Sequence, residues 1–211
     1  MDGNNRFSKK RDISIFDGYK KGAEKLLSIT KHVFENYDSE TISAFGLSHN
    51  NTKRSKILLS TLFEVFEYFL DQNHNNLNLN FNILFKGDLS FFPIKIKEKI
   101  KKLEKNISGY KKNLVVYLNY SGQLDIIKAA KFYNLNSINI KAFEKLLLTN
   151  NFKNPDMLIR TGGYQRISDF FLYQISFTEL FFLKKLWPEI TNSDISKIFE
   201  SYKKIERKFG Y

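Results

Sequence analysis

The sequence predicts an α/β domain in which a mainly parallel central sheet is flanked by helices. Short apolar runs alternate with segments of helical spacing along nearly all of the 211 residues, and this alternation is typical of parallel sheets. One of the runs, residues 114–118, is continuously apolar, as expected of a strand buried on both faces. No internal repeat, low-complexity linker or domain boundary interrupts the pattern. Residues 1–211 are therefore predicted to form one domain.

In the first half, apolar spacing predicts a helix over about residues 19–34, a short strand over 41–45 and a polar loop over 46–54. Residues 56–70 give the clearest amphipathic helix, because their apolar side chains recur at helical steps. Alternating apolar and polar residues over 77–85 predict a strand that ends in the turn Lys86-Gly87-Asp88.

In the second half, a basic helix is expected from Pro93 to about residue 107, and the apolar run 114–118 leads into a helix that ends near Tyr133. The remaining elements are expected to be a helix over 140–148, strands over 157–159 and 177–183, and a helix over 192–209. Ser193 could cap that final helix.

Composition excludes several classes of protein. A hydrophobic content of 42%, with 21 Phe and 11 Tyr, argues against disorder. Without cysteine there is no disulfide framework and no thiolate site, and three histidines leave little for a histidine metal cluster. No apolar run approaches the roughly 18 residues of a spanning helix, and the N-terminus does not resemble a signal peptide. A cytoplasmic protein, or one peripheral to a membrane, is expected.

The net charge of +12 favours an anionic partner, which could be a nucleic acid, a membrane surface or a phosphate substrate. Abundant Asn and Ile beside the Lys point equally to a compositional bias, and the charge alone leaves both explanations open. No zinc-finger, homeodomain or RNA-recognition motif accompanies it. A nucleic-acid-binding module is the weakest reading, and no nucleic acid is expected as partner.

The most informative stretch is residues 156–170. A short apolar strand ends there in Arg160 and the pair Gly162-Gly163, with Arg166 and Ser168 just beyond. Guanidinium groups fit phosphate, paired glycines let a chain pass close to a ligand, and ligands of parallel sheets lie beyond the carboxyl ends of strands. The stretch therefore predicts an oxyanion site. The alternative is a surface turn with solvated arginines.

The order of these residues resembles the C-terminal signature of the cis-prenyltransferases, which is roughly Pro-Asp-x-x-Ile-Arg-Thr-Gly-Gly-Glu-x-Arg-Ile-Ser-(Asn/Asp)-Phe. The resemblance continues through Glu179-Leu180-Phe181-Phe182 and Leu186-Trp187-Pro188-Glu189. The chain's first residues are similar to that family's Met-Asp-Gly-Asn-x-Arg-aromatic loop. This resemblance implies Mg²⁺-dependent condensation of isopentenyl diphosphate with an allylic diphosphate, usually farnesyl diphosphate, to give a cis-polyprenyl diphosphate.

The resemblance also implies a role for individual residues. Asp2 would assist departure of the diphosphate and, with Glu179, hold Mg²⁺. Asn51 would take part in proton removal. The allylic diphosphate would be bound by the loop Gly3, Asn4, Asn5, Arg6 and Phe7, with Tyr19 and Arg54, and the isopentenyl diphosphate by Arg160, Arg166, Ile167 and Ser168.

Several positions depart from the family pattern. Ile15 stands where many members have arginine, Tyr19 replaces a histidine, Gln123 an arginine and Tyr164 a glutamate. Asn51 and Arg54 align only if the central loop carries a two-residue insertion. The allylic half of the site is thus expected to have lost more charge than the isopentenyl half.

The family's first strand precedes Met-Asp-Gly-Asn, whereas this sequence begins at Met1. We expect either a start further upstream, which we favour, or a truncated protein that has lost this strand. We expect its absence to leave neighbouring strand edges unpaired and Asp2 loosely held. The resemblance implies a homodimer and leaves a heterodimer open. A weakly active or non-catalytic subunit of the same fold is the alternative function.

Overall fold

The structure is a computed structural model that describes residues 1–74, 79–105, 109–133 and 139–207. Its helices are α1 (Asn4–Arg11), α2 (Ile15–Asn36), α3 (Lys56–His74), α4 (Ile94–Lys105), α5 (Gly122–Phe132), α6 (Ile140–Glu144) and α7 (Asn192–Lys203). Its strands are β1 (Thr41–Ser48), β2 (Asn82–Gly87), β3 (Asn113–Tyr120), β4 (Met157–Arg160) and β5 (Glu179–Phe182). Short 3₁₀ turns η1 (His49–Lys53), η2 (Leu89–Phe91) and η3 (Trp187–Glu189) follow three of these elements.

All strand pairs are parallel, which confirms the predicted parallel α/β fold. The strands form two sheets rather than one, a three-stranded sheet in the order β1-β3-β2 and a two-stranded sheet of β4 and β5. In the described part of the chain β1 pairs only with β3, and β4 only with β5. Each of β1 and β4 thus keeps one edge that pairs with no described strand.

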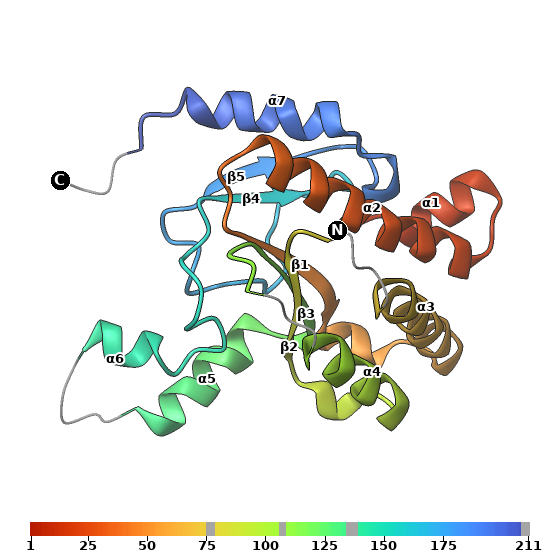
Figure 1. Cartoon of the computed structure of the whole chain (residues 1–211), viewed down its shortest axis with the longest axis horizontal. Helices are drawn as coiled ribbons and strands as arrows, with labels where there is room; N and C mark the ends of the chain where they lie inside the picture. The colour runs from red at the N-terminus through yellow and green to blue at the C-terminus, as the bar shows by residue number, and fades with distance from the viewer. Residues whose placement is uncertain (75–78, 106–108, 134–138, 208–211) are drawn as a thin grey trace.

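The strand β3 lies at the centre because both of its faces are buried. Leu114, Val116 and Leu118 belong to the larger core, which they share with α2, α3 and α4. Val115 and Tyr117 point to a smaller core on the opposite face, where they meet Phe171. Helices therefore cover the sheet as predicted, and Figure 1 shows α3 and α4 together on one side of it and α5 on another.

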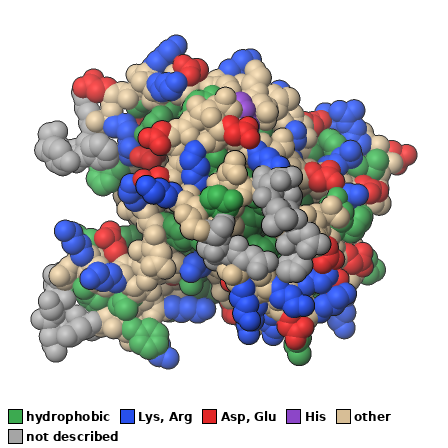
Figure 2. Space-filling model, viewed as in Figure 1, with side chains coloured by type: hydrophobic (Ala, Val, Ile, Leu, Met, Phe, Trp, Pro, Cys, Tyr) green, Lys and Arg blue, Asp and Glu red, His purple; other side chains and the backbone are tan. Residues whose placement is uncertain are grey.

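Lys and Arg side chains are spread over the visible surface (Figure 2), and α4 is rich in lysine. Part of this charge is structural. Lys95 of α4 pairs with Glu67 of α3 at 2.9 Å, and Lys99 pairs with Asp71 at 2.7 Å. These ion pairs join the two helices along their length, so the charge of α4 does not by itself indicate a nucleic acid.

Several predicted boundaries were wrong. The strand expected over 41–45 continues to Ser48, with a register shift between Phe45 and Leu47 that skips Gly46. The strand expected over 77–85 begins only at Asn82, and residues 75–78 lie outside the described residues. The helix expected over 140–148 ends at Glu144.

The final helix also differs from its prediction. Its N-cap is Thr191, whose hydroxyl accepts a hydrogen bond from Asp194 N, and not Ser193. The Asp194 carboxylate in turn accepts a hydrogen bond from Thr191 N, which completes a capping box that Ser193 could not form at that register. The helix ends at Lys203, and residues 208–211 lie outside the described residues.

Candidate active site

The first residues of the chain form a helix rather than the predicted turn. α1 begins at Asn4 after Gly3, whose φ of 114° is readily accessible only to glycine. Gly3, the N-cap residue, has no side chain that could cap the amides of this first turn. Uncapped amides at a helix N-terminus attract anions, so Asn4, Asn5 and Arg6 offer backbone donors as well as a guanidinium.

Two glycines of α2 let α1 approach it closely. A Cβ at Gly18 would lie 1.9 Å from Ser8 Oγ, and one at Gly22 would lie 2.2 Å from Asn4 Oδ1. The two glycines are four residues apart and therefore lie on one face of α2. This spacing is the sequence signal that could have predicted a helix packed across α2.

Asp2 is fixed by its backbone. Its amide donates to Thr161 Oγ1 at 3.0 Å, and the same hydroxyl donates to Asp2 O at 2.9 Å. The carbonyl of Asp2 also accepts from Trp187 N at 3.0 Å. The expectation that Asp2 would be loosely held was therefore wrong, because residues following β4 and β5 hold it instead.

The carboxylate of Asp2 lies between arginines from opposite ends of the chain. Arg160 Nη2 donates to Asp2 Oδ2 at 3.0 Å, and Arg6 Nη2 to Asp2 Oδ1 at 3.4 Å. Arg160 Nη1 also donates to Ser168 Oγ at 2.7 Å and to the carbonyl of Arg166. Arg160 Nε is buried and has no hydrogen-bond partner among the described residues, so one strong donor is still available in this cluster.

The ring of Tyr164 lies among the same guanidinium groups. The Cζ atoms of Arg166, Arg6 and Arg160 lie 4.1, 5.0 and 5.7 Å from its centroid. Asp2, Arg6, Arg160, Arg166 and Ser168 are thus gathered around one point, although the chain separates Asp2 from Arg160 by 158 residues.

The glycine pair serves geometry rather than anion binding. Gly162 and Gly163 both have a φ of 85°, which favours glycine. Their amides donate to Lys185 O and Leu183 O, so they do not face an anion. A Cβ at Gly162 would lie 2.4 Å from Arg6 Nη2, whereas one at Gly163 would meet nothing within 4 Å. Gly162 therefore makes room for Arg6.

The loop of Ser168 is held against the three-stranded sheet. Asp169 accepts hydrogen bonds from Gly122 N at 2.8 Å and from Gln123 N at 2.9 Å. Phe170 stacks on Phe45 of β1 with centroids 4.5 Å apart. Ser168 and Asp169 have positive φ, a strained backbone that is common at functional sites. Sequence reasoning did not single out Asp169 or Thr161, although both lie inside the motif.

The structure brings Tyr19, Asn51 and Arg54 together near the start of α3. Arg54 Nη1 donates to Tyr19 OH at 3.1 Å, and Arg54 N donates to Asn51 O at 3.3 Å. Among the described residues, no hydrogen bond or ion pair joins this group to Asp2. Tyr19, which stands where the family pattern has a histidine, therefore holds the Arg54 guanidinium through its hydroxyl.

Polar side chains also meet beyond the carboxyl ends of β1, β2 and β3. His49 Nδ1 is 2.9 Å from Asn119 Oδ1, and Asn119 Nδ2 donates to Asp88 O at 3.1 Å. A hydrogen bond from the Ser90 hydroxyl lowers the pKa of Asp88 below its ordinary value. These contacts hold together the loops at the carboxyl ends of the strands, which is where parallel sheets bind their ligands.

Two predicted residues lie elsewhere. Glu179 begins β5 and pairs with Met157, whereas Arg160 pairs with Phe182 at the other end of the strand. Three residues of strand correspond to roughly 10 Å, so Glu179 is not beside Asp2 in one chain. Phe7 is 8% exposed and lines a cavity of about 820 Å³ with Lys10, Arg11 and Lys21, apart from the arginine cluster.

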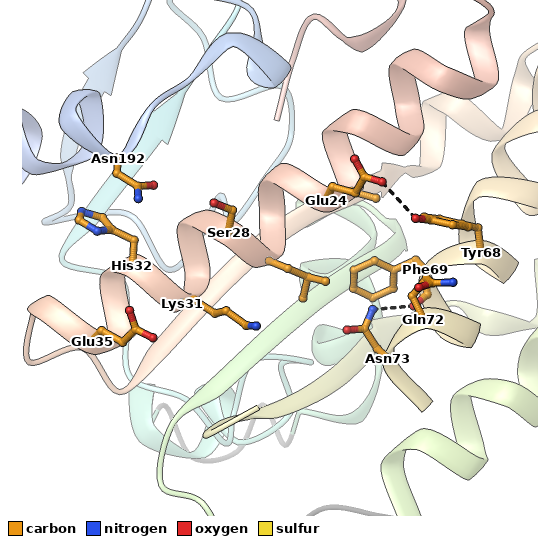
Figure 3. A pocket seen from close by; sticks show the side chains of 12 residues that line it. Glu24, Ser28, Lys31, His32, Glu35, Tyr68, Phe69, Gln72, Asn73 and Asn192 are labelled. Carbon is orange, nitrogen blue, oxygen red and sulfur yellow. Dashed lines mark hydrogen bonds between the residues drawn. The ribbon is translucent and has the colours of Figure 1, made fainter. Parts of the chain in front are cut away.

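A further cavity of about 510 Å³ lies between α2, α3 and the start of α7 (Figure 3). Polar and apolar side chains share its wall, and Tyr68 OH donates to Glu24 Oε1 at 3.0 Å. None of the predicted site residues lines it. No helix in the described ranges is long and apolar enough to cross a bilayer.

Comparison with known proteins matches this chain to one enzyme family. Residues 1–210 match the family described as putative undecaprenyl diphosphate synthase. A tritrans,polycis-undecaprenyl-diphosphate synthase (geranylgeranyl-diphosphate specific) of Pyrobaculum aerophilum is 36% identical over 99% of this chain and 92% of its own. Dehydrodolichyl diphosphate synthase 3 of Arabidopsis thaliana is 33% identical over 100% of this chain and 74% of its own.

Two solved structures of prenyl diphosphate synthases are similar to this chain. Lavandulyl diphosphate synthase from Lavandula x intermedia, solved in complex with dimethylallyl diphosphate, superposes with a TM-score of 0.91 at 28% identity, covering 100% of this chain and 95% of that one. A probable undecaprenyl diphosphate synthase from Campylobacter jejuni superposes with a TM-score of 0.81 at 26% identity, covering 90% and 92%.

Proposed function

This chain belongs to the undecaprenyl diphosphate synthase family of cis-prenyltransferases, and on that premise we propose that it extends an allylic diphosphate with isopentenyl diphosphate in cis. The enzyme is a prenyltransferase. The primer that we propose is farnesyl diphosphate. The name of the Pyrobaculum relative points to geranylgeranyl diphosphate for that protein, so both primers belong in the test.

One observation carries the proposal. The carboxylate of Asp2 is held between Arg6 and Arg160, at 3.4 and 3.0 Å, and these two arginines belong to the two motifs at opposite ends of the sequence. A purely structural ion pair would not need a third guanidinium. That of Arg166 lies over the ring of Tyr164, beside those of Arg6 and Arg160. Two of these guanidinium groups pair with the Asp2 carboxylate, and all three lie around the ring of Tyr164. Three positive charges beside one carboxylate leave an excess that a diphosphate would balance.

The residues divide between two diphosphates. Arg6 and the uncapped amides of α1 would hold the allylic diphosphate, and Arg160, Arg166 and Ser168 the isopentenyl diphosphate. The C–O bond to the allylic diphosphate breaks, the alkene carbon of isopentenyl diphosphate forms the new C–C bond, and a proton is lost. Holding both diphosphates fixes the two carbons near reacting distance, and the donors stabilise the leaving group.

Asn51 is proposed at the proton-removal step, where an amide would orient the acceptor rather than keep the proton. Arg54 and Tyr19, joined at 3.1 Å, would support the allylic side of the site. Ile167 would line the isopentenyl side, next to Arg166 in the chain.

Mg²⁺ is the proposed metal. In the described part of the chain no group of three or more His, Cys, Asp or Glu side chains forms a cage. That fits Mg²⁺, which keeps several waters and takes one or two carboxylates with phosphate oxygens. Asp2 would contribute such a carboxylate, and the ion would neutralise charge on the departing diphosphate.

We also propose a homodimer. The edge strand β5 exposes Leu180 by 44%, with Phe177 just before it exposed by 58%. Apolar side chains on an edge strand favour association with a second chain. A cytoplasmic location with peripheral membrane contact remains the expectation, because a polyprenyl chain is apolar.

The test is incubation with labelled isopentenyl diphosphate, Mg²⁺ and, in separate reactions, dimethylallyl, farnesyl and geranylgeranyl diphosphate. Chain-extended products that require an allylic primer would support the proposal. Binding of diphosphate without any incorporation would favour the alternative of a non-catalytic subunit. Absence of both binding and incorporation would contradict the proposed function.

A further inference from the structure

Tyr164 is the departure from the family pattern that lies closest to the proposed chemistry. It stands directly after the glycine pair, and its side chain is 43% exposed. Guanidinium groups of Arg166, Arg6 and Arg160 lie 4.1, 5.0 and 5.7 Å from its ring centroid. All three distances are within the range of cation–π attraction, which extends to about 6 Å. Three cations on one ring are more than ordinary surface packing needs.

These cations require something to hold them together. The three arginines repel one another, and the carboxylate that pairs with two of them is that of Asp2. The family pattern places a glutamate at position 164, and such a carboxylate would accept hydrogen bonds from the same guanidiniums. An aromatic ring attracts the cations through its face and neutralises none of their charge.

The ring also leaves the hydrogen-bonding groups free. A guanidinium stacks through its flat face, whereas its N–H donors point outward in the plane. One arginine can therefore rest on Tyr164 and donate to a diphosphate at the same time. A carboxylate at position 164 would instead compete with the diphosphate for those donors.

The arginines come from both halves of the site. Arg6 belongs to α1, at the proposed allylic diphosphate, and Arg160 and Arg166 follow β4, at the proposed isopentenyl diphosphate. Like the Asp2 carboxylate, the ring of Tyr164 contacts arginines of both halves.

We propose that Tyr164 is a positioning residue that holds the arginines of both diphosphate sites ready for binding, and thereby links the two sites. This inference rests on the proposed function. Because the ring arranges guanidiniums for both diphosphates, its loss weakens the binding of both substrates. The rate of the chemical step changes less, since Asp2 keeps its backbone contacts to Thr161 and Trp187.

The test compares Tyr164→Leu with Tyr164→Phe in the full chain. Tyr164→Leu removes the ring and is expected to raise KM for each diphosphate substrate roughly fivefold to tenfold, with kcat within about threefold. Tyr164→Phe keeps the ring and is expected to restore both KM values to within about twofold of the original. Calorimetric titration with inorganic pyrophosphate gives a second readout that does not depend on turnover.

Unchanged KM values and pyrophosphate affinity in Tyr164→Leu would overturn the inference while leaving the proposed function intact. A change in KM for one substrate alone would overturn the link between the sites. Failure of Tyr164→Phe to restore binding would mean that the hydroxyl, not the ring, matters, and would also overturn it. An original chain that neither binds pyrophosphate nor turns over would overturn the proposed function itself.

Discussion

The hydroxyl of Thr161 makes two hydrogen bonds to the backbone of Asp2, accepting from its amide at 3.0 Å and donating to its carbonyl at 2.9 Å. Thr161 directly follows β4 and is 1% exposed. Asp2, just before α1, is thus fixed to a strand end 159 residues away in the sequence. This contact brings the two motifs of the sequence into one site.

Replacing Thr161 by valine removes both hydrogen bonds at nearly constant shape. We expect a loss of about 1–3 kcal/mol in the free energy of unfolding, because two backbone groups of Asp2 lose their buried partner. We also expect kcat to fall roughly tenfold as the carboxylate loses its fixed position. Denaturant unfolding and steady-state kinetics measure the two effects. Thr161→Ser keeps the hydroxyl and should retain most of both; an equal loss in the serine variant would contradict this role.

Gly162 and Gly163 provide a matched pair of variants. Alanine at either position must adopt a φ of 85°, so both variants should lose about 1–2 kcal/mol of stability. Only Gly162→Ala places a Cβ 2.4 Å from Arg6 Nη2. We therefore expect KM for the allylic diphosphate to rise at least about tenfold in Gly162→Ala and to change little in Gly163→Ala. Similar kinetics in the two variants would show that Arg6 does not need this space.

The exposed edge of β5 predicts the effect of a charge at Leu180. Leu180→Arg should convert the proposed dimer to monomer, because an unpaired charge cannot be buried in an apolar interface. Light scattering after gel filtration measures the mass, and Leu180→Met is the control that keeps an apolar side chain. A monomer in both the original chain and Leu180→Met would contradict the dimer.

The capping box of α7 predicts a pH dependence of stability. Burial by itself raises the pKa of Asp194, but hydrogen bonds from Lys185 and Thr191 outweigh it and lower this pKa to about 2. A carboxyl with a lowered folded pKa stabilises the protein above its unfolded pKa of 3.8, and this contribution is lost as the pH falls towards about 2.

Asp194→Asn should therefore cost about 1 kcal/mol at pH 7. The difference from the original chain should shrink between pH 4 and pH 2. Urea unfolding at several pH values tests this, and a difference independent of pH would contradict it.

The sequence predicted the alternation of helices and strands, the central strand β3 and the residues of the arginine cluster. These features depend on local periodicity and on ordered motifs, which a single sequence contains. The helix α1 was missed because Asn4, Asn5 and Arg6 form no apolar stripe, and its position depends on close packing over Gly18 and Gly22. Thr191 was missed as a cap because Ser193 has equivalent local chemistry.

The sequence predicted less of the long-range geometry. The sequence could not predict that β1 and β4 lie in separate sheets, since pairing depends on which edges meet in space. It also placed Glu179 with Asp2, whereas the parallel register of β4 and β5 puts Glu179 at the far end of the strand. The contacts of Tyr164 depend on side chains from α1 and from the loop after β4, and no local pattern contains them.

The central claim is that Asp2, held between Arg6 and Arg160, drives ionisation of an allylic diphosphate. It is tested most directly by single-turnover incorporation of labelled isopentenyl diphosphate into a bound allylic primer, for the original chain and for Asp2→Asn. The account predicts a rate at least roughly a hundredfold lower in Asp2→Asn. It also predicts pyrophosphate affinity that is unchanged or higher, because the guanidiniums lose a competing carboxylate. A rate in Asp2→Asn within a few fold of the original would contradict it.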